Sequence, residues 1–165
     1  AMRDNNPVLF FEHKVLYGVE GPVPDGDYVV PLGKAKVRKA GKDVTVIASS
    51  VMVHKSLAAA AALAGEGIDV EVIDLRTVSP LDVETITESV KKTHRAVVVQ
   101  EAMKMAGTNA QVIALIVENA FNWLEAPIKQ VAALDTIIPF SPPMEDFVLP
   151  DENKIIAAVK EVMAS

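Results

Sequence analysis

The chain has 165 residues, half of them hydrophobic, and this length suits a single domain. Its formal net charge of −6 argues against a general nucleic-acid binder, because a surface that follows phosphates needs clustered lysine and arginine. The chain has no cysteine, which excludes disulfides and thiolate metal sites. It shows no signal peptide and no apolar run near the ~20 residues that span a bilayer, so no membrane partner is predicted.

The first 17 residues of the chain are predicted to lead into the domain. Residues 1–17 are interpreted as an entry segment, with a short strand at residues 8–11, and residues 18–165 as the domain itself. Prolines and glycines between residues 18 and 33 predict a surface loop with a turn at Asp25-Gly26. The basic residues from 34 to 42 alternate with apolar ones, which favours the solvent face of an edge strand over a nucleic-acid site.

Strands and helices are predicted to alternate through the rest of the chain. The strands are almost continuously apolar, as in a mainly parallel sheet that helices cover on both faces. We therefore expect a three-layer α/β/α domain with about five strands. Its strands are predicted at 44–48, 70–75, 96–99 and 128–134, its helices at 52–64, 82–92, from 106 or 107 to 119, and 151–163, and a proline-rich loop at 138–150.

The sequence gives little support for any of the familiar catalytic motifs. Gly65-Glu66-Gly67 follows a helix, whereas a dinucleotide fingerprint follows a strand, so these glycines are predicted to end the helix. The histidines at 13, 54 and 94 are not spaced as metal ligands, and packing or solvent exposure is favoured over catalysis for each. Ser49-Ser50 lacks the Gly-x-Ser-x-Gly nucleophile pattern and is predicted to cap the following helix.

Charged side chains at predicted strand ends are the better candidates for a site. Arg76 follows the 70–75 strand and Glu101 follows the 96–99 strand. Both therefore lie at the carboxyl ends of strands, where open α/β sheets bind ligands and partners. If their strands are neighbours, the two could form an ion pair or a binding site, and both interpretations stay open. Asp135 ends the 128–134 strand and could simply begin a turn, and Asp82 starts a helix.

Several runs of residues, taken in their order and spacing, form one pattern: Asn6-Pro7-Val8-Leu9-Phe10-Phe11-Glu12-His13-Lys14, Leu16-Tyr17-Gly18, Val30-Pro31-Leu32-Gly33-Lys34-Ala35, Asp74-Leu75-Arg76-Thr77, Ser79-Pro80-Leu81-Asp82, Glu101-Ala102, Asn122-Trp123-Leu124-Glu125-Ala126-Pro127 and Pro139-Phe140. This pattern covers nearly the whole chain and closely resembles the carboxyl-terminal domain of the transketolase superfamily, specifically that of the beta subunits of 2-oxo acid dehydrogenases.

The resemblance implies an α2β2 enzyme that uses thiamine diphosphate and Mg²⁺ to decarboxylate a 2-oxo acid such as pyruvate and to pass the acyl group to lipoamide. It places the cofactor mainly on the alpha subunit and the activating glutamate on the beta subunit's amino-terminal domain, from which residues 1–17 would arrive. Asp25-Gly26-Asp27 is not the family's Gly-Asp-Gly cofactor motif. The chain alone is therefore expected to be inactive, with no catalytic, cofactor or metal residues.

The resemblance also implies an assembly role. Its partners would be the alpha subunit, a second beta subunit and the peripheral subunit-binding domain of the lipoyl acyltransferase, in the cytoplasm or an organellar matrix. Arg76, Asp82, Glu101, Asp135 and Phe140 are expected to shape loops or lie at these interfaces. Acetoin and branched-chain 2-oxo acid dehydrogenases stay open as alternatives, and so does a free-standing module that binds a small ligand. Residues 103–109 depart from the family's glycine-rich stretch.

Overall fold

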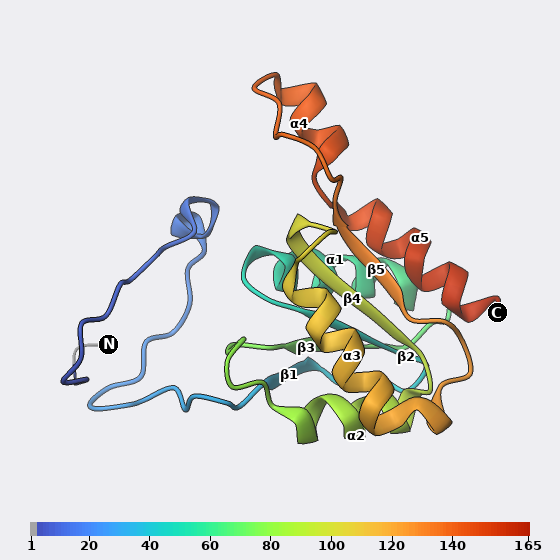
Figure 1. Cartoon of the computed structure of the whole chain (residues 1–165), viewed down its shortest axis with the longest axis horizontal. Helices are drawn as coiled ribbons and strands as arrows, with labels where there is room; N and C mark the ends of the chain where they lie inside the picture. The colour runs from blue at the N-terminus through green and yellow to red at the C-terminus, as the bar shows by residue number, and fades with distance from the viewer. Residues whose placement is uncertain (1–2) are drawn as a thin grey trace.

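A five-stranded sheet forms the centre of the molecule (Figure 1). The computed structural model describes residues 3–165. The strand order is β1-β3-β2-β4-β5, in which β1 is antiparallel to β3 and all other neighbours are parallel. The strands are β1 (Lys36–Lys39), β2 (Val44–Ala48), β3 (Val70–Asp74), β4 (Ala96–Met103) and β5 (Lys129–Ala133).

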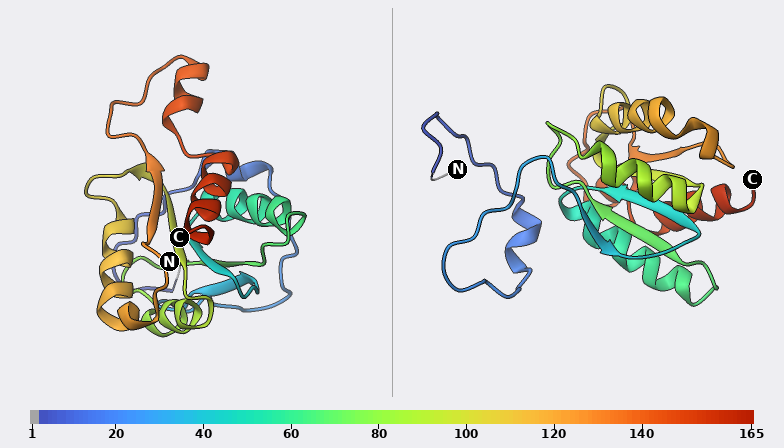
Figure 2. Two further views of the ribbon diagram at one scale, coloured as in Figure 1. Left: turned by 90° about the vertical axis from the view of Figure 1, so that its right-hand side faces the viewer. Right: turned by 90° about the horizontal axis from the view of Figure 1, so that it is seen from below.

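Helices cover both faces of this sheet, which confirms the predicted three-layer α/β/α domain (Figure 2, right). Helices α1 (Val51–Ala64) and α5 (Glu152–Met163) pack on one face, and α2 (Val83–Thr93) and α3 (Thr108–Ala120) pack on the other. Two short 3-10 helices, η1 (Lys14–Gly18) and η2 (Phe121–Trp123), lie outside the layers. No helix among residues 3–165 has both the length and the apolar character to cross a membrane.

Alternation along the strands produces two hydrophobic cores. In β2, Val46 faces α1 and α5 while Ile47 faces α2 and α3, because successive side chains point to opposite faces. In β3, Val72 and Ile73 divide in the same way. Both faces of the sheet are therefore buried beneath helices, as the continuous apolar runs predicted.

Side-chain caps mark the starts of two helices, α2 and α5. The side chain of Asp82 accepts a hydrogen bond from Thr85 N at the start of α2, and that of Asp151 accepts one from Lys154 N at the start of α5, as predicted for Asp151. Gly65 follows the last residue of α1, in agreement with the predicted helix end. Ser50 occupies the position before α1, but its side chain makes no capping hydrogen bond and its φ is 53°.

Three predicted boundaries differ from the structure. Residues 8–11 form no strand, because they extend from the domain without a neighbouring strand. The predicted 138–150 loop contains helix α4 (Pro142–Val148), in which the two prolines occupy the first turn, where a proline loses no helical hydrogen bond. Strand β4 runs to Met103 instead of ending at Val99.

Two segments leave the compact layers. The leading segment (residues 3–35) runs beside the domain, blue in Figure 1. The α4 arm (residues 134–149) projects beyond the carboxyl end of β5, orange in Figures 1 and 2. Residues 1–2 of the predicted 1–17 entry segment lie outside the described residues.

Candidate functional site

The predicted strand-end residues gather at the carboxyl edge of the sheet but not in one cluster. Strand β2 lies between β3 and β4, so Arg76 and Glu101 do not follow neighbouring strands. The condition for their pairing is therefore not met. Among residues 3–165, Arg76 has no carboxylate partner within ion-pair distance, whereas Glu101 is paired with His13.

Arg76 lies in a fixed turn after β3. Its φ is 55°, and its backbone N donates to Asp74 Oδ1 at 3.1 Å, so the turn is stabilised by its own aspartate. The neighbouring Thr77 accepts a hydrogen bond at Oγ1 from Gly33 N at 3.1 Å. This turn therefore holds the end of the leading segment, while the Arg76 side chain points into solvent.

Glu101 holds the leading segment from a second point. His13 Nε2 lies 2.9 Å from Glu101 Oε2, and both side chains are partly buried. Three residues later Leu16 packs against the core beneath α1 and α5. The pair and the leucine together fix η1 on the domain.

Asp82 is the most completely buried of the predicted residues. Its Oδ2 accepts hydrogen bonds from Ala35 N at 3.0 Å and Thr85 Oγ1 at 2.8 Å, and Lys34 Nζ lies 4.0 Å from Oδ1. Burial by itself raises the pKa of this carboxyl, but the hydrogen bonds from Thr85 and Ala35 and the charge of Lys34 together lower the pKa below its ordinary value. Asp82 is thus an ionised anchor for α2 and β1.

Asp135 connects two loops. Its Oδ1 accepts a hydrogen bond from Met105 N at 2.8 Å, which ties the β4–α3 loop to the base of the α4 arm. A cavity of about 570 Å³ lies between these loops, lined by Met103, Met105, Ala106, Asp135, Thr136 and Ile137. Asp135 therefore shapes the surface from which the arm projects.

Phe140 lies fully exposed on the α4 arm, with a relative accessibility of 103%. Other large apolar residues of the arm are exposed too: Ile137, Ile138, Met144 and Phe147. Large apolar side chains that are exposed together on one short segment are typical of interaction sites. The arm is therefore the clearest candidate contact surface on the domain.

Gln100 and Asn109 shape the β4–α3 loop, and sequence reasoning missed both. Gln100 Oε1 accepts a hydrogen bond from Asn109 N at 2.8 Å, and Gln100 Nε2 donates to Met103 O at 2.5 Å. Asn109 Nδ2 donates to Val98 O at 2.9 Å. The loop is therefore held by these two buried amides.

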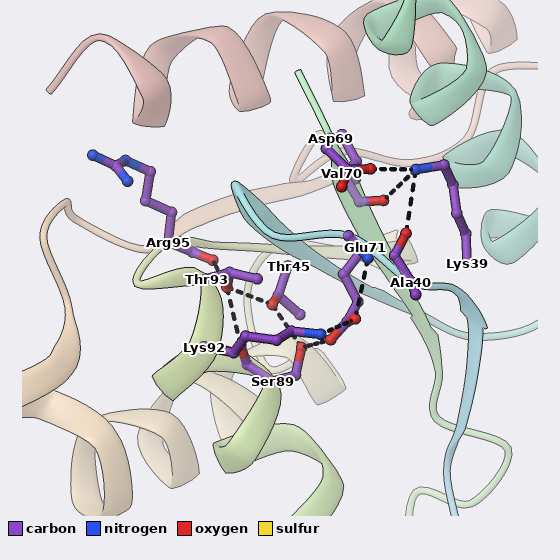
Figure 3. A network of polar contacts seen from close by, with 11 residues as sticks. Lys39, Ala40, Thr45, Asp69, Val70, Glu71, Ser89, Lys92, Thr93 and Arg95 are labelled. Atoms are coloured by element: carbon purple, nitrogen blue, oxygen red, sulfur yellow. Dashed lines mark hydrogen bonds and ion pairs between the residues drawn. The ribbon is translucent and has the colours of Figure 1, made fainter. Parts of the chain in front are cut away.

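A buried polar network on the α2 face was also missed (Figure 3). The Glu71 carboxylate accepts hydrogen bonds from Ser89 Oγ and Lys92 Nζ, and Thr45 Oγ1 lies 2.7 Å from both Ser89 Oγ and Thr93 Oγ1. The network joins α2 to the amino-terminal halves of β2 and β3, far along the strands from Arg76. Glu71, a charged residue inside the apolar 70–75 run, was the sequence feature that could have indicated this network.

A second cavity, the α3 groove, lies at the other end of β5. It has a volume of about 630 Å³ and is lined by Ile113, Val117, Phe121, Asn122 and the residues from Leu124 to Ile128. Within residues 3–165, no three histidine, aspartate or glutamate side chains come together as metal ligands.

Comparisons with known proteins agree with this fold. Residues 33–155 match the family model described as "Transketolase, C-terminal domain". The chain is 49% identical over 164 residues to the pyruvate dehydrogenase E1 component subunit beta of Bacillus subtilis, covering 99% of the chain and 50% of the relative. It is 47% identical over 163 residues to the acetoin:2,6-dichlorophenolindophenol oxidoreductase subunit beta of Cupriavidus necator, covering 99% and 48%.

A solved structure supports the same relationship. The protein titled "Split gene transketolase, inactive beta4 tetramer" superimposes with a TM-score of 0.74 and 28% identity, over 87% of this chain and 46% of that one. The chain thus spans about half the length of the curated relatives it matches.

Proposed function

Since the chain belongs to the transketolase C-terminal domain family, we propose that it is the assembly domain of the beta subunit of a thiamine diphosphate-dependent 2-oxo acid dehydrogenase. The reaction would be oxidative decarboxylation of pyruvate with acyl transfer to lipoamide. The partners would be an alpha subunit, a second beta subunit and the peripheral subunit-binding domain of the acyltransferase.

One observation carries this proposal: a well-packed domain presents two separate apolar surfaces. The α4 arm is one, and the leading segment is the other, with large side chains exposed at Leu9, Phe10, Phe11, Val15, Tyr17, Val23, Val29 and Leu32. Exposing this much apolar surface to water is unfavourable, so both surfaces are expected to be covered in the working protein. A subunit embedded in an assembly meets this requirement.

The leading segment is suited to join this domain to the rest of a longer subunit. We propose that residues 3–17 arrive from a preceding cofactor-binding domain, which covers their apolar side chains. The His13–Glu101 pair and the packed Leu16 support this, since they give an otherwise extended segment a defined course over the sheet.

The chemistry of the proposed enzyme belongs to groups outside residues 3–165. Thiamine diphosphate would supply the stabilised carbanion when bound. This domain positions the leading segment, through the turn at Arg76, the anchor at Asp82 and the ion pair at Glu101.

Two substrates have support among the relatives, pyruvate and acetoin, and we favour pyruvate. The free-standing module is not favoured by the geometry. Arg76 follows β3 and Glu101 lies within β4, and β2 separates these two strands. Neither residue lines the α3 groove or the cavity beside Asp135.

A hybrid subunit tests the assembly role. This chain replaces the matching half of the Bacillus subtilis relative, and the hybrid is co-expressed with that enzyme's alpha subunit. We expect a purified complex that reduces 2,6-dichlorophenolindophenol with pyruvate, because the relative's own half supplies the cofactor contacts. The unaltered relative is the control. A hybrid that is folded by circular dichroism but recovers no alpha subunit would contradict the proposal.

A further inference from the structure

Three methionines among residues 3–165 are exposed to solvent. Met103 is 48% exposed, Met105 is 76% exposed and Met144 is 59% exposed, whereas Met52 in the core is 1% exposed. Methionine is usually a buried residue that fills gaps between other apolar side chains. Three exposed thioethers on one domain therefore call for an explanation other than packing.

These methionines belong to segments that leave the same end of the sheet. Met103 is the last residue of β4, Met105 lies in the β4–α3 loop and Met144 lies in helix α4. Figure 1 shows this loop and the α4 arm beyond the carboxyl end of the sheet. Met103 and Met105 line the cavity of about 570 Å³ beside Asp135, together with Ile137 of the arm. The three thioethers are thus part of the surface from which the arm projects.

The backbone that carries Met103 and Met105 is fixed by hydrogen bonds. Met103 O accepts one from Gln100 Nε2 at 2.5 Å, and Met105 N donates one to Asp135 Oδ1 at 2.8 Å. The two side chains are therefore exposed in the folded chain itself. A small oxidant can reach their sulfur atoms without any local unfolding.

We propose that Met103, Met105 and Met144 form an oxidation site for peroxides, which is open in the unassembled chain and is covered by assembly. This deepens the proposed function, on which it rests for the contact that covers the surface. Oxidation and assembly then compete for the same side chains. A chain that is oxidised first is excluded from the complex.

The reaction requires only the thioether and the peroxide. A sulfur lone pair attacks one peroxide oxygen, so that an S–O bond forms while the O–O bond breaks, and the departing hydroxide takes the proton of the transferred hydroxyl group and leaves as water. The sulfur is oxidised by two electrons and the peroxide is reduced. The product is a polar sulfoxide. Burying a sulfoxide in an apolar contact without a hydrogen-bond donor is unfavourable, so oxidation weakens any contact that this surface makes.

Peptide mapping of the 165-residue chain after treatment with hydrogen peroxide tests the site itself. Met103, Met105 and Met144 are expected to be oxidised at least about tenfold faster than Met52, which is the buried control. Circular dichroism before and after treatment checks that the chain stays folded. Equal rates for the exposed methionines and Met52 in the folded chain would overturn the site.

The hybrid subunit described above tests the competition with assembly. Peroxide treatment of the free hybrid is expected to raise the subunit concentration that gives half-maximal assembly with the alpha subunit at least about tenfold. The matched control is a hybrid with Met103→Leu, Met105→Leu and Met144→Leu, which keeps apolar side chains of similar size but has no thioether at the site. It should assemble equally well before and after treatment. An equal loss of assembly in both hybrids would overturn the proposal, because other residues would then be responsible.

The assembled hybrid complex provides the reverse measurement. The three methionines are expected to be oxidised at least about tenfold more slowly in the complex than in the free hybrid. Unchanged rates would overturn the competition and would leave the proposed function standing, because the hybrid would still have assembled. A hybrid that fails to assemble before any treatment would contradict the proposed function and the competition together, whereas the peptide mapping decides the oxidation site by itself.

Discussion

His13 and Glu101 lie 88 residues apart in the chain, yet His13 Nε2 is 2.9 Å from Glu101 Oε2. The contact fixes the leading segment on the carboxyl edge of the sheet, in the place where Arg76 was considered as the partner of Glu101. Since His13 Nδ1 is buried without a hydrogen-bond partner, the pair is held by a single contact. Its loss should free the segment locally without unfolding the domain.

Glu101→Ala is therefore expected to speed tryptic cleavage after Lys14 by about two- to fivefold, because a partly exposed pair contributes about 0.5–1 kcal/mol to local closure. Limited proteolysis followed by mass spectrometry measures the rate. Arg76→Ala is the control, since Arg76 does not touch the leading segment through its side chain in the described structure. Equal cleavage rates in the Glu101 variant and the wild type would show that Leu16 alone holds η1.

The contrast between these two residues shows what the sequence could predict. Apolar runs such as 44–48 identified the strands, and Asp151 before the last helix identified its start, because both signals are local. The order of the strands is not local, and β2 between β3 and β4 is what separates Arg76 from Glu101. His13 had no nearby partner in the sequence, so only the folded chain reveals its role.

Helix α4 shows a different limit. The proline density of residues 138–150 predicted a loop, although Ser141 before Pro142 and Pro143 is also a helix-start pattern. Both interpretations were compatible with the residues. In the folded chain the segment is a helix, and Lys154 and Leu134 make hydrogen bonds to the backbone carbonyls of Phe147 and Val148 at its end.

Asp82→Ala is expected to lower the free energy of unfolding by about 1.5–5 kcal/mol. The helix cap contributes about 0.5–2 kcal/mol, and the unpaired backbone N of Ala35 adds about 1–3 kcal/mol. Urea unfolding measures the change. Asp82→Asn should lose less, because asparagine is also a good cap; equal losses in the two variants would assign the effect to charge and not to capping.

The same carboxyl predicts a dependence on pH. The pKa of Asp82 is lower in the folded chain than its ordinary value of 3.8, so its stabilising effect is complete above that value and is lost as the pH falls through the lowered folded pKa. The stability difference between the wild type and Asp82→Asn should therefore be constant near neutral pH and shrink below about pH 4. Urea titrations at several pH values measure it. A difference that stays constant down to pH 2 would contradict this.

The ion pair between buried Glu71 and half-exposed Lys92 predicts an unequal response to removal of its two members. Lys92→Met leaves a carboxylate that is 2% exposed without its cation, which should cost about 3 kcal/mol or more. Glu71→Gln should cost less, because Lys92 is half exposed and its ammonium can turn to water, while the amide oxygen still accepts a hydrogen bond from Ser89.

The order of the two losses in urea unfolding is the measurement for this pair. Lys91→Met is the matched control: Lys91 is the adjacent lysine, and its partner Glu88 lies on the surface, so the loss should stay below about 1 kcal/mol. If Glu71→Gln proved more destabilising than Lys92→Met, the Lys92 ammonium would not be what stabilises the buried carboxylate. The hydroxyl chain through Ser89 and Thr45 would then carry that role.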